Sequence, residues 1–149
     1  KYRVVAKCAV GLYGFNAGPG VYIVDPLAIA DGFLSRLPSK RPAYPGHYER
    51  ALPEGYVETI VADKNLLRDP ALAELYDQMR LLQRVPLLEP ARWRAIWAMN
   101  TGGDRRLVAR AKYDPNKTWT PGVPNPAAAS TLPLSCMGQL DPLLTVRLK

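Results

Sequence analysis

Residues 47–50 bring together three side-chain types that can do chemistry. His47 carries an imidazole, Glu49 a carboxylate and Arg50 a guanidinium, with Tyr48 among them. Such a group of donors and acceptors suits the recognition of a polyol such as a sugar, whose hydroxyls both donate and accept hydrogen bonds. The same groups also suit a structural ion-pair cluster, and the sequence leaves both interpretations open.

Asp25 stands directly before Pro26, at the end of an apolar run. Aspartate followed by proline is typical of a helix N-cap and the first helical position. We therefore expect Asp25 to cap a short helix over residues 27–30. The alternative is that its carboxylate orients a sugar hydroxyl.

Trp93 and Trp97 are four residues apart in a segment with helical spacing of apolar residues. Residues four apart lie on the same face of a helix. This pattern more often indicates part of a core. The alternative is a surface platform on which a sugar ring stacks.

Cys8 and Cys136 are the two cysteines of the chain. In an oxidising compartment they are candidates for one disulfide. In the alternative, Cys8 is a buried free thiol within an apolar strand. His47 has no cysteine near it and no Cys-x-x-Cys occurs, so no zinc site is expected and no cofactor is predicted.

Gly11, Gly14, Gly18 and Gly20 follow an expected strand, as nucleotide-binding loops do. A dinucleotide fingerprint runs directly into a helix, however, whereas here a second strand follows. No G-K-[S/T] or G-x-S-x-G motif occurs, and no spacing singles out a carboxylate pair. We predict no catalytic residue in this chain.

The chain has 149 residues, enough for about one domain. It carries 20 basic and 13 acidic residues, a net charge of +7, and both terminal thirds are basic while the middle is almost neutral. This charge favours an anionic partner such as nucleic acid, lipid head groups or a lipid-linked phosphosugar, or else reflects a solvated basic surface. Apolar runs are far shorter than the roughly 20 residues of a membrane helix, and no signal peptide is expected.

The elements that must position these residues follow from periodicity, prolines and glycines. Strands are expected over residues 2–10 and 21–24, with a loop over residues 11–20 between them, and an edge strand over residues 143–148. Expected helices cover residues 27–30, 31–37, 53–61, 70–84, 90–102 and 103–112.

These elements predict an α+β fold, in which a small sheet built from the N-terminal strands packs against several helices. We expect residues 1–113 to form this domain. Residues 114–149 are rich in proline, so helix is excluded there and an extended tail that packs on the same domain is expected.

Four runs carry a resemblance to bacterial polytopic glycosyltransferases of the GT-C class, in particular to the mycobacterial terminal arabinofuranosyltransferase-like proteins. They are G-L-Y-G-F-N-A-G-P-G-V-Y-I-V-D-P-L-A-I-A-D (11–31), G-H-Y-E-R-A-L-P-E-G-Y (46–56), R-D-P-A-L-A-E-L-Y-D-Q-M-R-L (68–81) and R-W-R-A-I-W-A-M-N-T-G (92–102). The similarity covers residues 4–112. Ala28-Ile29 stands where that family has Gly-Leu, and Asn16 where an aromatic residue is common.

The resemblance implies the soluble C-terminal domain of a membrane enzyme, on the extracytoplasmic (periplasmic) side of the cell envelope. Such enzymes transfer a sugar from a polyprenyl-phosphate donor to an acceptor glycan, and their catalytic carboxylate lies near the first membrane helices. This chain is then an accessory domain that is not catalytic alone and that contacts the membrane through the rest of the protein. Asp25, His47, Glu49 and Arg50 match polar positions of the family and are expected to contact the glycan.

Two other functions remain open at this point. One is a self-contained periplasmic carbohydrate-binding module. The other is a basic nucleic-acid-binding domain, although no zinc finger, RNA-binding aromatic motif or basic heptad helix supports it, and nucleic acid is not our expected partner.

Overall fold

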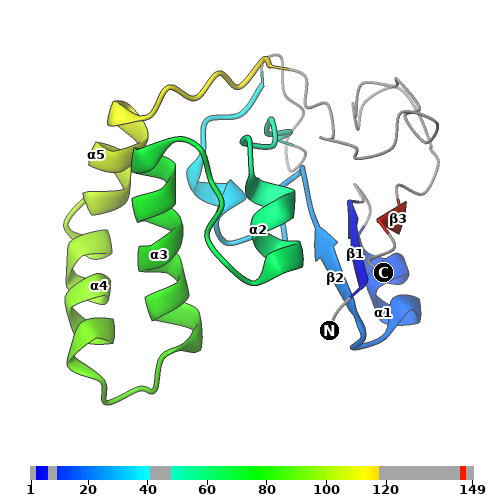
Figure 1. The fold of residues 1–149 in the computed structure, drawn as a ribbon, viewed down its shortest axis with the longest axis horizontal. Helices are drawn as coiled ribbons and strands as arrows, with labels where there is room; N and C mark the ends of the chain where they lie inside the picture. The colour runs from blue at the N-terminus through cyan, green and yellow to red at the C-terminus, as the bar shows by residue number, and fades with distance from the viewer. Residues whose placement is uncertain (1–2, 7–9, 41–47, 118–144, 147–149) are drawn as a thin grey trace.

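The computed structural model describes residues 3–6, 10–40, 48–117 and 145–146. Within them a small sheet lies beside a group of helices, which confirms the predicted α+β class. His47, Cys8 and Cys136 lie outside the described residues, as does most of the proline-rich segment, so the predictions for them remain predictions. Figure 1 shows α2 between the sheet and the helices α3, α4 and α5, with α1 on the other side of the sheet.

The sheet has the strand order β2-β1-β3. β1 (Arg3–Ala6) pairs in parallel with β2 (Val21–Val24), and antiparallel with the short edge strand β3 (Thr145–Val146). β1 and β2 read as almost continuous apolar runs, as expected for parallel strands covered on both faces. The predicted edge strand near the C-terminus is confirmed at residues 145–146.

α1 (Val10–Ala17) occupies most of the segment for which we predicted a loop, so that prediction was wrong. Parallel neighbours need a crossover connection, which is usually a helix, and this requirement overrides the low helix propensity of Gly11 and Gly14. Gly14 lies against the Ile23 side chain, where an added Cβ would come within 3.3 Å of it. Gly18 follows the helix in the left-handed region (φ 73°), the usual C-terminal stop.

Residues 25–37 also differ from the sequence-based expectation. Residues 27–30 form a tight turn rather than a helix, and the helix expected over residues 31–37 is reduced to the 3-10 turn η1 (Leu34–Arg36). Ala28 lies in the left-handed region (φ 57°), which is incompatible with a regular helix. This is the position where the resembling family has glycine.

The remaining helices agree closely with the predictions. α3 (Pro70–Arg84) begins where Asp69-Pro70 predicts it, and the Asp69 carboxylate accepts hydrogen bonds from two backbone N–H groups of its first turn. α4 (Pro90–Asn100) and α5 (Gly103–Arg110) follow. α2 (Tyr56–Ala62) begins three residues later than expected.

The core lies between β1–β2, η1, α2 and α3. At its centre the rings of Phe33 and Tyr56 stack at 4.9 Å between centroids, and Tyr76 meets both edge-on at 5.5 and 6.2 Å. α3 turns its apolar face to this core, where Leu72, Leu75, Tyr76 and Met79 are all buried. This core fixes the loop after β2 against α2 and α3.

Candidate functional site

Asp25 is fully buried at the end of β2. Its Oδ1 accepts a hydrogen bond from Leu27 N at 3.0 Å, and its Oδ2 accepts from Ile29 N at 2.7 Å and Ala30 N at 2.9 Å. The carboxylate therefore caps backbone donors as predicted, but those of a turn rather than of a helix. With both oxygens bonded inside the fold, its evident role is to shape this loop.

Backbone hydrogen bonds hold Glu49 and Arg50 against the same loop. Glu49 is buried and pairs with Lys40, whose Nζ lies 2.6 Å from Oε1. Arg50 N donates to Pro26 O at 2.8 Å, and its guanidinium donates to the carbonyls of Leu37 and Leu27 at 3.3 Å each. Burial lowers the pKa of Arg50, and its guanidinium lies over the Tyr48 ring at 5.8 Å.

These contacts give Glu49 and Arg50 the structural ion-pair and hydrogen-bond roles that were one of the two interpretations of this segment. Arg50 joins the loop after β2 to the end of η1. The structure thus brings Arg50 close to Asp25, although the two residues are 25 positions apart in sequence. Both carboxylate oxygens of Asp25 accept hydrogen bonds from backbone N–H groups, and Nε and Nη1 of Arg50 donate to backbone carbonyls.

A second buried carboxylate, Asp31, lies in the aromatic core. Its Oδ1 accepts from Phe33 N and Leu34 N, and its Oδ2 accepts from the Tyr56 hydroxyl at 2.7 Å. Desolvation by burial raises the pKa of Asp31, and it also raises the pKa of Tyr56 and brings that of Tyr22 to about 12. Sequence reasoning placed Asp31 at a helix start but missed its partner, because nothing in the spacing links it to Tyr56.

Trp93 and Trp97 are on the surface, so the interpretation of this pair as core was wrong. Trp93 is 53% and Trp97 74% exposed, while α4 buries its opposite side through Ala95 and Met99. α4 packs against α3 and α5, and the side chains that it buries are Ala95 and Met99. We call Trp93, Trp97, Ile96 and Asn100 the outer face of α4.

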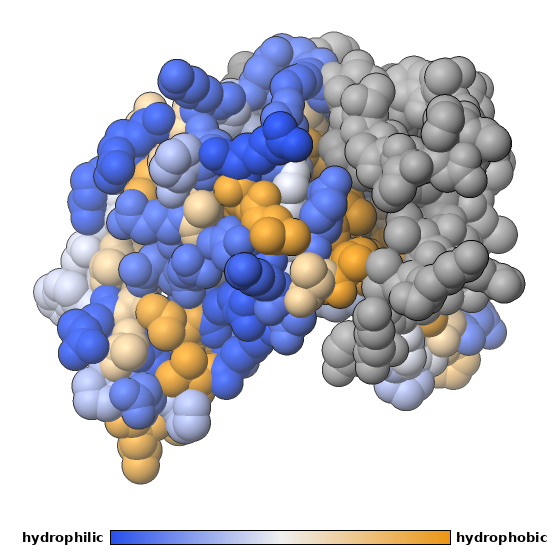
Figure 2. Space-filling model, in the orientation of Figure 1, coloured by the Kyte–Doolittle hydropathy of each residue, from blue (hydrophilic) through white to orange (hydrophobic). Residues whose placement is uncertain are grey.

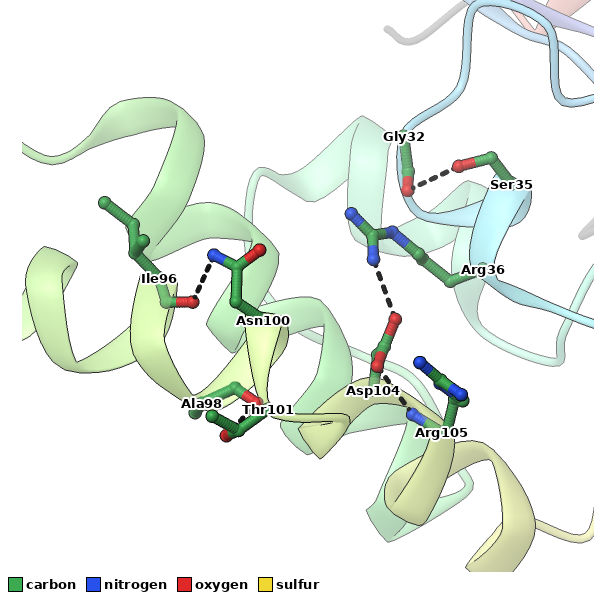
Figure 3. Close-up of polar contacts among 9 residues, drawn as sticks. All are labelled: Gly32, Ser35, Arg36, Ile96, Ala98, Asn100, Thr101, Asp104 and Arg105. Atoms are coloured by element: carbon green, nitrogen blue, oxygen red, sulfur yellow. Dashed lines mark hydrogen bonds and ion pairs between the residues drawn. The ribbon is translucent and has the colours of Figure 1, made fainter.

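Polar groups frame the Trp97 end of the outer face. Asn100 Nδ2 donates to Ile96 O at 2.9 Å and the Thr101 hydroxyl donates to Ala98 O at 3.2 Å (Figure 3). The Thr101 hydroxyl also lies 2.9 Å from Trp97 O, so both side chains are held in place by the helix. Arg36 pairs with Asp104 at 2.7 Å and thereby ties η1 to the start of α5. The end of α4 is therefore a well-fixed surface.

A cleft of about 650 Å³ lies between the start of α2, the start of α3 and the segment after α5. Its lining mixes acidic and basic side chains that come from three separate stretches of sequence, including Glu54, Glu58, Arg68, Asp69, Lys112 and Lys117. Several are already paired: Lys117 Nζ lies 2.5 Å from Glu54 Oε1, and Lys112 N donates to Asp69 Oδ2 at 2.8 Å. Sequence reasoning missed this cleft, since no local pattern joins the three stretches.

The described part of the chain holds no group of three or more histidine, cysteine, aspartate or glutamate side chains placed to bind a metal ion. None of its helices has the length and apolarity needed to cross a membrane.

Comparisons with family models, with curated proteins and with solved structures gave no match to this chain.

Proposed function

We propose that this chain is a glycan-binding accessory domain, and that the outer face of α4 is where the glycan lies. The observation that carries this proposal is the exposed tryptophan pair, Trp93 and Trp97, one turn apart on a helix whose other side is buried. Large aromatic side chains are usually buried, so two exposed indoles on one face favour a binding role. Each exposed indole offers an apolar ring face on which a sugar ring can stack.

The chemistry of the face fits a sugar. The C–H side of a pyranose or furanose ring is apolar and stacks on an indole, while its hydroxyls need hydrogen-bonding groups at the rim. Asn100 stands beside the indoles, with its amide nitrogen fixed by Ile96. Arg94 is exposed on the neighbouring side of the helix and supplies donors for hydroxyl or acidic groups.

The buried acidic residues argue for an accessory role rather than a catalytic one. Asp25, Asp31 and Glu49 each engage protein donors within the fold. A general acid or base must come within hydrogen-bonding reach of the substrate atom that it serves, and these three side chains are used in shaping loops and core. We expect the chain alone to have no transferase activity.

The sequence resemblance supplies the wider context of the proposal. In it, the chain belongs to an extracytoplasmic glycosyltransferase that uses a polyprenyl-phosphate sugar, and it helps to shape or hold the acceptor. Membrane fractionation of source cells with an antibody to this domain tests the context separately. A longer, membrane-bound product is expected, whereas a soluble product of this size would favour a self-contained carbohydrate-binding module.

The binding claim is tested by titrating the 149-residue chain with soluble oligosaccharides, including arabinofuranose oligomers, and following tryptophan fluorescence. Stacking on an aromatic ring contributes about 0.5–1.5 kcal/mol, so Trp97→Ala should weaken binding about two- to twelvefold. Phe15→Ala is the matched control, because Phe15 is an exposed aromatic residue on α1. Equal affinities of the Trp97→Ala and Phe15→Ala variants would contradict the proposed face.

A further inference from the structure

The turn between α3 and α4 presents two leucines to solvent. Leu87 is 60% and Leu88 84% exposed, and they occupy the two central positions of a turn closed by Glu89 N donating to Pro86 O at 3.1 Å. Adjacent, almost fully exposed leucines at one point are unusual on a soluble surface. We refer to residues 85–89 as the hairpin tip.

The hairpin tip is held in this conformation by the residues around it. Pro86 and Pro90 restrict the backbone at its two ends, and Arg92 NH1 donates to Val85 O at 2.6 Å across its base. The leucines are therefore fixed in an outward position, so their exposure is a property of the turn and not of a loose loop. A rigid apolar projection loses little conformational freedom when it is buried by a partner.

The hairpin tip is also the part of α3 and α4 farthest from the sheet. Figure 1 shows the α3–α4 connection at the lower end of the helical pair, and Figure 2 shows hydrophobic surface at the same extremity. Trp93 follows within the first turn of α4. Leucine and tryptophan side chains are among those that proteins insert into the boundary of a lipid bilayer. Here the two leucines stand at the tip, and Trp93 lies one helical turn further along α4.

The charge near the hairpin tip identifies the kind of bilayer. Residues 84–94, which flank the tip, carry three basic and one acidic side chains, a net charge of +2, and Arg94 is exposed among them. The helix α1 also exposes leucine and phenylalanine side chains, but residues 10–24 contain no lysine or arginine. An anionic surface is therefore complementary to the hairpin tip and not to α1.

We propose that the hairpin tip docks on the surface of a phospholipid bilayer that contains anionic lipids, with Leu87 and Leu88 entering the head-group boundary and Arg94 at the start of α4 facing the lipid phosphates. Leu87 and Leu88 lie outside the proposed glycan face, whereas Trp93 and Arg94 stand where the two surfaces meet. It would set the orientation of the domain relative to the membrane, with the Trp97 end of α4 directed away from the lipid.

Co-sedimentation of the 149-residue chain with vesicles tests the contact. Vesicles of phosphatidylcholine mixed with phosphatidylglycerol should bind the chain, and those of phosphatidylcholine alone should bind it much less. Leu87→Ser/Leu88→Ser should weaken binding about tenfold or more, since each leucine that enters the boundary adds apolar burial. Leu12→Ser is the matched control, because Leu12 is an exposed leucine (78%) on α1.

The electrostatic part is tested by Arg94→Gln, with Arg68→Gln as its control. Arg68 is exposed at the opposite end of α3, about 20 Å from the hairpin tip at 1.5 Å per residue. Arg94→Gln should weaken binding to the anionic vesicles several-fold and reduce its salt dependence, while Arg68→Gln should have a smaller effect. Equal effects of the two substitutions would contradict the assigned orientation.

Absence of binding to anionic vesicles, or a loss caused by Leu12→Ser but not by the Leu87→Ser/Leu88→Ser pair, would overturn the proposal. The Leu87→Ser/Leu88→Ser variant should keep the oligosaccharide affinity of the wild type. A failure of lipid binding is thus distinguishable from a failure of the proposed glycan site.

Discussion

At the scale of single residues, buried carboxylates organise the loops of this protein. Asp25 closes the turn after β2 by accepting three backbone hydrogen bonds, and Asp31 joins η1 to Tyr56. A buried polar group costs free energy unless it is hydrogen-bonded, so each of these carboxylates stabilises the fold only in the conformation that satisfies it. They therefore specify loop conformation.

Tyr56→Phe should destabilise the protein by about 1–3 kcal/mol, because it leaves Asp31 Oδ2 buried without the hydroxyl donor. The measurement is urea unfolding at neutral pH. Tyr76→Phe is the matched control, since that ring packs in the same cluster while no hydrogen bond from its hydroxyl to another described residue is found. It should change stability by less than about 0.5 kcal/mol, and similar losses in the two variants would exclude the assigned role of the Tyr56 hydroxyl.

Ala28→Gly should be neutral or stabilising. An L-residue in the left-handed region pays roughly 1–2 kcal/mol, which glycine avoids, and this gain offsets the lost methyl group and the freer unfolded chain. Ala30→Gly, at a neighbouring position without a positive φ, should instead destabilise by about 0.5–1 kcal/mol. Thermal unfolding of both variants checks this, and an equal loss at both positions would show that Ala28 is not strained.

At this scale the sequence predicted Asp25 as a capping side chain and placed Asp31 at the start of a helix, but it did not predict the partners of either. The donors to Asp25 come from a turn that exists because Ala28 adopts a positive φ, and alanine gives no local signal of that. Tyr56 reaches Asp31 through the core, which only the packing of α2 against η1 decides.

At the scale of elements, local sequence signals determine where some helices begin, whereas tertiary packing determines others. α3, α4 and α5 begin where proline or glycine and the apolar periodicity predict, because such boundary signals act within a few residues. α1 was not predicted, because its glycines oppose helix and only the pairing of β1 with β2 requires a crossover there. The exposure of Trp93 and Trp97 was equally unpredictable, since helical spacing shows that two residues share a face but not which way the face points.

Asp69 is the clearest test of an element boundary. Its Oδ1 caps α3 through Ala71 N and Leu72 N, and its Oδ2 accepts from Lys112 N. Partial burial raises the pKa of this carboxyl, but the three backbone donors outweigh that effect and hold the pKa below its usual value of 3.8. Asp69→Ala should cost about 1–2 kcal/mol at neutral pH.

Because the folded-state pKa of Asp69 is depressed, its contribution is present above pH 3.8 and is lost as the pH falls through the folded-state pKa. The difference in unfolding free energy between the wild type and Asp69→Asn should therefore shrink on acidification. Urea titrations at several pH values measure it. A difference that grows towards low pH would contradict the assigned protonation.

At the scale of the whole molecule, the buried core and the candidate binding surfaces lie in different parts of the fold. The sheet, η1 and α2 enclose the buried carboxylates and the aromatic cluster, whereas α4 and the hairpin tip expose their largest apolar side chains. The proposed glycan face and lipid contact occupy successive parts of the same helical hairpin. Such an arrangement would hold a glycan at a fixed height above a membrane.

Binding of a glycan by Trp93 and Trp97 can be followed by NMR of the tryptophan indole N–H signals during titration with an oligosaccharide. The signals are assigned with Trp93→Phe and Trp97→Phe variants. We expect those of Trp93 and Trp97 to shift together and saturably with the bound oligosaccharide. If an oligosaccharide binds the chain while both signals stay unchanged, or if none binds, the outer face of α4 is not a glycan site.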